Sequence, residues 1–62
     1  MNNIDTTHYN KYKIQPRDFI TQNNLDFNVG SIIKYVVRYK SKNGLEDLKK
    51  AQNYINYLKD FL

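Results

Sequence analysis

The chain of 62 residues has no cysteine, one histidine, one proline and two glycines. Without cysteine it can form neither a disulfide nor a thiolate zinc site, and one histidine cannot build a histidine-rich metal site. So few glycines and prolines argue against an all-β domain, which needs many tight turns. We therefore expect an all-α fold with no metal site.

The chain also lacks any apolar run near the roughly 20 residues that a membrane span requires. Its first ten residues are polar and do not resemble a signal peptide. We therefore expect a cytoplasmic protein that does not bind a membrane.

The length allows one domain with a thin core, because a chain this short buries only about 60% of its unfolded surface. We expect residues 1–7 to be a polar tail and residues 8–62 to be a single helical domain. The first 13 residues have no helical period, so they predict an extended N-terminal arm. Self-association would add buried surface, and we therefore expect a homo-oligomer.

Three helices are expected. The first begins near Pro16, whose missing N–H suits the first helical position, and ends at Asn23 and Asn24, which tolerate a left-handed C-cap. The second spans about Val29 to Lys40, with Asn28 as its N-cap, because apolar residues recur there at helical spacing.

The third helix is expected from about Leu45 to the end of the chain, opened by a capping box of Asn43 and Glu46. It carries two apolar stripes, and such a helix usually packs against two surfaces. One stripe would face the core and the other a neighbouring subunit. The stripes consist of Leu45, Leu48, Ile55, Leu58 and Leu62, and of Tyr54, Tyr57 and Phe61.

The ten Lys and Arg residues exceed the six Asp and Glu residues, which gives a formal charge of +4. Such a charge favours anionic partners: nucleotides, phosphorylated metabolites, nucleic acid or acidic protein. The charge alone does not choose among them.

The second helix carries the most informative polar face. Lys34 and Arg38 are i, i+4 neighbours with Ser31 and Tyr35 beside them. Two cations and two hydroxyls could hold a phosphate, with arginine offering a bidentate fork, whereas the alternative is a solvated helix face. Tyrosines beside cations suit base stacking, and the alternative is that their rings cover a small core.

Three further polar features have open roles. His8 is the one side chain of a type that ordinarily titrates near neutral pH, so it is the candidate catalytic residue, or else a surface residue. Asp47 could pair with Arg38 across the helical hairpin and fix its fork. Glu46 and Lys50 have the spacing of an i, i+4 ion pair.

Familiar catalytic and nucleotide-binding motifs are absent. The chain has no Walker phosphate loop, no G-x-G-x-x-G and no H-E-x-x-H. With one histidine and no cysteine, it offers no Ser/His/Asp or Cys/His set. A bound phosphate would therefore be held by side chains and helix N-termini.

Several short motifs follow one another along the chain from His8 to about Leu58. They are His8-Tyr9, Pro16-x-Asp18-Phe19-Ile20, Leu25-x-Phe27-x-x-Gly30-x-x-x-Lys34-Tyr35-x-x-Arg38, Glu46-Asp47-Leu48, Lys50-Ala51 and Tyr54. This order resembles a small tailed-phage domain of unknown function, shared with a phage nucleoside-monophosphate kinase that lacks a Walker motif. The kinase is much longer, so the chain would match its shared domain alone.

The resemblance implies a phage protein that binds a nucleotide in the cytoplasm of an infected bacterium. The protein would either transfer a phosphoryl group to a nucleotide, as a kinase does with ATP, or simply sequester a nucleotide, including a signalling nucleotide. Enzymatic activity therefore stays open. A non-enzymatic anti-defence protein that docks on a host protein through its aromatic stripe is the alternative, and nucleic-acid binding ranks third. The nucleotide-binding residues that the resemblance implies are His8, Tyr9, Lys34, Tyr35, Arg38, Asp47, Lys50 and Tyr54.

Overall fold

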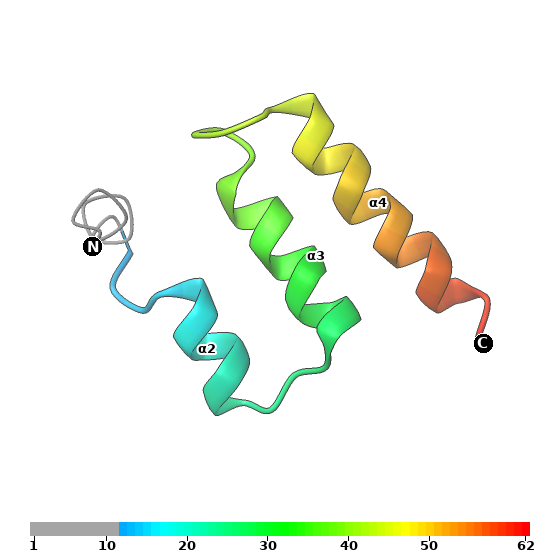
Figure 1. Cartoon of the computed structure of the whole chain (residues 1–62), viewed down its shortest axis with the longest axis horizontal. Coiled ribbons are helices and arrows are strands. Elements are labelled where there is room, and N and C mark those ends of the chain that lie inside the picture. Colours follow the sequence, from blue (N-terminus) through cyan, green and yellow to red (C-terminus); the bar gives the residue numbers. More distant parts are fainter. Residues whose placement is uncertain (1–11) are drawn as a thin grey trace.

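The computed structural model describes residues 12–62, which form three helices and no strand (Figure 1). They are α2 (Pro16–Gln22), α3 (Phe27–Arg38) and α4 (Leu45–Lys59). The predicted all-α class is confirmed. The predicted tail, most of the predicted arm, His8 and Tyr9 lie outside the described residues.

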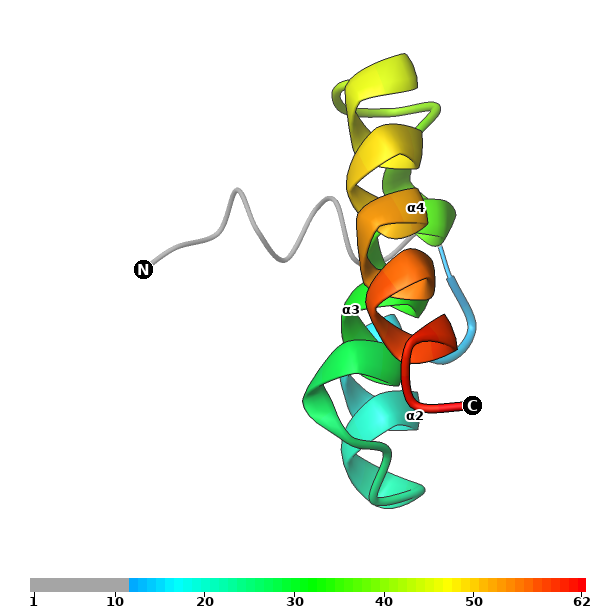
Figure 2. The ribbon, with the colours of Figure 1, turned by 90° about the vertical axis from the view of Figure 1, so that its right-hand side faces the viewer.

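The three helices lie in one layer. α3 occupies the middle and packs against α2 on one side and α4 on the other, whereas α2 and α4 do not pack against each other. Turned by 90°, the helices overlap in one column (Figure 2). A single layer leaves two broad faces open, whereas most domains close at least two layers around a core. None of these helices is long and apolar enough to cross a membrane.

The start of α3 differs from the prediction. Asp26 is its N-cap: the carboxylate Oδ1 accepts a hydrogen bond of 2.9 Å from the backbone N–H of Val29. Asn28, the predicted cap, lies inside the helix. The end of α2 agrees with its prediction, because Asn24 has a left-handed φ of 54°.

The predicted capping box of α4 is also wrong. Gly44 precedes the helix with a φ of 53°, and no side chain caps the first turn. Asn43 contributes its backbone instead: its N–H donates a hydrogen bond of 3.1 Å to Oδ2 of Asp47. The turn thereby ties the carboxylate of Asp47 into the α3–α4 junction.

The core is very small. Among the described residues, Ala51 is the one buried hydrophobic side chain, accompanied by buried Ser31 and Asp47. Gly30 permits the closest approach of α2 to α3, because a Cβ there would lie 2.9 Å from Cγ2 of Ile20.

Neither stripe of α4 forms a core alone. Tyr54 packs against α3 and Leu58 is half-buried, while Leu48, Ile55 and Tyr57 remain exposed. One residue of each predicted stripe, Tyr54 and Leu58, is therefore half-buried, and the buried Asp47 and Ala51 belong to neither stripe.

Candidate functional site

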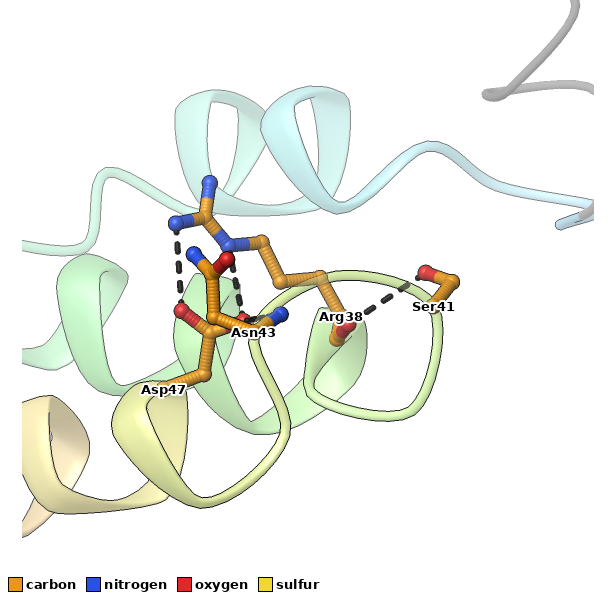
Figure 3. A network of polar contacts seen from close by, with 4 residues as sticks. All are labelled: Arg38, Ser41, Asn43 and Asp47. Carbon is orange, nitrogen blue, oxygen red and sulfur yellow. Dashed lines mark hydrogen bonds and ion pairs between the residues drawn. The ribbon is translucent and has the colours of Figure 1, made fainter.

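A bidentate ion pair joins the end of α3 to the start of α4 (Figure 3). Arg38 donates from Nε to Oδ2 of Asp47 at 3.3 Å and from Nη2 to Oδ1 at 3.2 Å. The backbone N–H of Asn43 supplies a third donor to the same carboxylate. This confirms the predicted pairing of Arg38 with Asp47.

Asp47 is charged although its side chain has no solvent-exposed surface. Burial raises the pKa of the Asp47 carboxyl, but the hydrogen bonds from Arg38 and Asn43 and the charge of Arg38 outweigh burial. The net result is a pKa below the usual value of 3.8. A carboxylate so enclosed cannot reach a ligand, so any role of Asp47 in binding runs through Arg38.

The Arg38 guanidinium stays partly accessible, with 33% of the side chain exposed. Its Nη1 makes no hydrogen bond within the described part of the chain, so part of the fork faces outward with its orientation already fixed. Ser41 secures the end of the helix, because its hydroxyl donates to the carbonyl of Arg38 at 3.3 Å.

Three cations surround one aromatic ring. The Arg38 Cζ lies 4.9 Å from the ring centroid of Tyr35, and the Nζ atoms of Lys34 and Lys50 lie 5.0 Å and 5.5 Å from it. Cation–π attraction to the ring offsets part of the repulsion among these charges. We call these four residues the cation cluster.

The two lysines of the cation cluster carry uncompensated charge. Within residues 12–62, neither Lys34 nor Lys50 forms an ion pair. The predicted pair of Glu46 with Lys50 is absent, because the Lys50 side chain extends toward Tyr35 on α3 instead. The cluster therefore brings three positive charges to one place with one buried carboxylate to balance them.

Aromatic contacts extend the cluster along the α3–α4 seam. Tyr54 stacks on Tyr35 with centroids 6.0 Å apart and planes 19° apart. Phe27 meets the edge of Tyr54 at 5.8 Å. Tyr54 thus links the cations to the start of α3.

Two hollows flank this seam. A groove of about 450 Å³ runs between α2 and α3, and Ser31, Lys34 and Arg38 line it together with aliphatic residues of α2. A second hollow of about 460 Å³ lies at the other end of the α3–α4 seam. It is lined by Phe27, Asn28, Asn53, Tyr54 and Tyr57.

Six of the eight predicted site residues lie in the described part of the chain, and all six belong to one connected set. Their roles in binding stay predictions. Sequence reasoning did not single out Asn28 or Asn53 as site residues, because their meeting depends on how α3 crosses α4. The set consists of Lys34, Tyr35, Arg38, Asp47, Lys50 and Tyr54.

A family model described as "protein of unknown function (DUF3310)" matches residues 4–56. The chain belongs to the DUF3310 family. No curated protein and no solved structure matches it. The matched region of this DUF3310 chain contains all eight predicted site residues, from His8 to Tyr54, and the family assigns them no role.

No three His, Asp or Glu side chains among residues 12–62 form a group that could hold a metal ion. The site itself consists of two lysines, an oriented arginine, aromatic rings and one buried carboxylate.

Proposed function

We propose that this DUF3310 chain is a nucleotide-binding protein that holds the phosphates on Lys34, Arg38 and Lys50. The observation that carries the proposal is the cation cluster, in which three cations lie 4.9 to 5.5 Å from one ring centroid. Bringing like charges together is unfavourable, and a multiply charged phosphate group relieves that repulsion. A neutral ligand would not relieve that repulsion.

The cations have different roles in this proposal. Arg38 presents Nη1, the guanidinium nitrogen not bonded to Asp47, in an orientation that Asp47 has already fixed, so little side-chain entropy is lost on binding. Lys34 and Lys50 supply mobile point charges that follow the phosphate. Tyr35 lies within the cluster and stacks on Tyr54, so its ring supports the cations and we do not assign it to base stacking.

The resemblance to a phage nucleotide kinase domain favours a nucleotide over other phosphate compounds as the ligand. His8 and Tyr9 keep their predicted roles as proton carrier and stacking residue, and both lie outside the described residues. We propose a phage protein that acts in the infected host cytoplasm on this basis alone.

Turnover and sequestration are two forms of the same proposal. Phosphoryl transfer needs two positioned nucleotides and stabilised transition-state charge, which a single layer of three short helices does not enclose. A homo-oligomer could complete the site, and the exposed Val36, Leu48 and Ile55 provide apolar surface for it. Incubation with a nucleoside monophosphate and ATP distinguishes the two: product formation indicates a kinase, and tight binding without product indicates sequestration.

A host-protein partner is the second candidate. Tyr57 and Phe61 pack edge to face with centroids 5.1 Å apart, and both remain more than half exposed. An exposed aromatic pair is typical of an interaction hot spot. This candidate requires that Phe61→Ala abolish function while Lys50→Ala leaves it intact. Nucleic-acid binding remains third, and a salt-insensitive or absent DNA and RNA shift would exclude it.

Thermal denaturation with nucleoside mono-, di- and triphosphates and cyclic nucleotides tests the proposal. A ligand at about 100 times its dissociation constant should add about 2.7 kcal/mol to the free energy of unfolding. Lys50→Ala should lose most of that gain, and Lys49→Ala, the same change one position away on an exposed side chain, should keep it. Equal gains in both variants, or no gain for any nucleotide in the wild type, would contradict the proposal.

A further inference from the structure

The second hollow combines exposed aromatic rings with amide side chains. Phe27 is 74% exposed and Tyr57 is 52% exposed, an unusual degree for aromatic side chains in a helical hairpin. Asn28 and Asn53, from α3 and α4, line the same hollow. We call Phe27, Asn28, Asn53, Tyr54 and Tyr57 the aromatic–amide shelf.

The two amides of the shelf have unused hydrogen-bonding capacity. Neither Asn28 nor Asn53 makes a side-chain hydrogen bond within residues 12–62. By contrast, Gln52 and Asn56 on α4 bond to each other at 3.2 Å. An amide offers both a donor and an acceptor, which is the pattern that the edge of a nucleobase requires.

The shelf is continuous with the cation cluster. Tyr54 belongs to the shelf and stacks on Tyr35, and Phe27 meets Tyr54 at its edge. Phe27 and Lys34 are seven positions apart on α3, which corresponds to about 10 Å along the helix axis. A ligand anchored by phosphate at the cluster can therefore extend along the seam to the shelf.

We propose that the aromatic–amide shelf holds the base of the nucleotide, with Phe27 and Tyr57 contacting its faces and Asn28 and Asn53 reading its edge. This deepens the proposed function and rests on it. The groove between α2 and α3 suits a base less well, because it has two aromatic residues, Tyr12 and Phe27, among aliphatic ones. The shelf has three aromatic residues and two amides. Stacking on aromatic rings is the interaction that bases share, and amides add selectivity among them.

Titration calorimetry on the full chain tests the inference with two kinds of probe. The affinity for inorganic tripolyphosphate measures binding at the cation cluster alone. The affinities for the four common ribonucleoside triphosphates measure binding at the cluster and the shelf together. We expect at least one nucleotide to bind about tenfold more tightly than tripolyphosphate, the gain of one base stack. Phe27→Ala should remove that gain and leave tripolyphosphate binding unchanged.

Two further variants sharpen the test. Asn53→Ala, at an exposed position of α4, should change the relative affinities of the four nucleoside triphosphates several-fold without changing the affinity for tripolyphosphate. Phe19→Ala is the matched aromatic control, because Phe19 is 45% exposed on α2 and does not line the shelf. This variant should change the affinity for neither tripolyphosphate nor the nucleotides.

The outcomes separate the inference from the function on which it rests. Binding of all probes with equal affinity, unaffected by Phe27→Ala, would overturn the shelf while the anion site stands. Loss of nucleotide binding in Phe19→Ala but not in Phe27→Ala would also overturn it. No binding of any probe to the folded wild type would overturn the proposed function together with the shelf.

Discussion

Arg38 and Asp47, nine positions apart in the chain, form a two-pronged contact of 3.3 Å and 3.2 Å between α3 and α4. Asp47 is fully enclosed by this contact and the turn, whereas the Arg38 side chain is one-third exposed. The pair therefore fastens the hairpin from inside and orients a cation outward. One interaction links the stability of the fold to the geometry of the candidate site.

Replacing Asp47 tests both consequences. Asp47→Asn keeps the shape but removes the charge, so Arg38 loses its partner inside a partly buried site and the thermal midpoint should fall clearly. Anion affinity should fall as well, because the guanidinium is no longer held. Glu46→Gln makes the same change of charge on an exposed neighbour and should leave both quantities unchanged. Equal midpoints for the two variants would contradict the structural role of the pair.

The pH dependence follows from the direction of the Asp47 pKa. Its pKa is below 3.8 in the folded chain, so the unfolded chain takes up a proton at higher pH than the folded one. The stabilisation is present above the ordinary pKa and is lost as pH falls through the folded pKa. Urea unfolding of wild type and Asp47→Asn should therefore differ most near about pH 7 and converge as the pH falls through the folded pKa, which lies below 3.8. A difference that is constant with pH would show that the carboxylate charge contributes nothing.

Gly30 should be intolerant of a methyl group. Gly30→Ala places a Cβ 2.9 Å from Cγ2 of Ile20, and such overpacking costs about 1–3 kcal/mol, against about 1 kcal/mol regained from helix propensity. We expect a net loss in urea unfolding. Adding Ile20→Leu, which lacks that branch, should relieve the loss, whereas Ile20→Val, which retains it, should not. Equal stability of Gly30→Ala and wild type would contradict the close approach of α2 to α3.

Gly44 should be intolerant for a different reason. No atom lies within 4 Å of a Cβ built there, but its φ of 53° with ψ of −122° is unfavourable for other residues. Gly44→Ala should cost about 1–3 kcal/mol through backbone strain alone. Lys42→Ala, at an exposed position of the same turn, is the control, and we expect a change within about 0.5 kcal/mol. A Gly44→Ala variant as stable as wild type in urea would show that the turn adopts another conformation.

Local signals in the sequence were sufficient for the helices and for one long-range contact. Pro16 marked the start of α2, and apolar spacing marked α3. The Arg38–Asp47 pair followed from the short turn between them, because few positions on facing helix ends can meet. These features depend on neighbouring residues in the chain and little else.

The sequence did not predict features for which two residues compete for one role, or features that depend on how α3 crosses α4. Asp26 and Asn28 both suit an N-cap, and their order in the sequence does not show which one the helix selects. Lys50 does not pair with Glu46, because its side chain contacts the ring of Tyr35 across the hairpin instead. The meeting of Asn28 with Asn53 likewise requires the observed packing of α3 on α4, so no local pattern indicates the shelf.

The most direct test of nucleotide binding at the cation cluster is a titration of the ¹⁵N-labelled chain with ATP, followed by backbone amide chemical shifts. We expect saturable shifts centred on Lys34, Tyr35, Arg38 and Lys50, extending toward Phe27 and Asn53. Amides near Asp18 and Phe19, exposed residues of α2 that line neither hollow, should stay unchanged. An unperturbed spectrum at millimolar ATP, or shifts confined to the region of Asp18 and Phe19, would contradict nucleotide binding at this site.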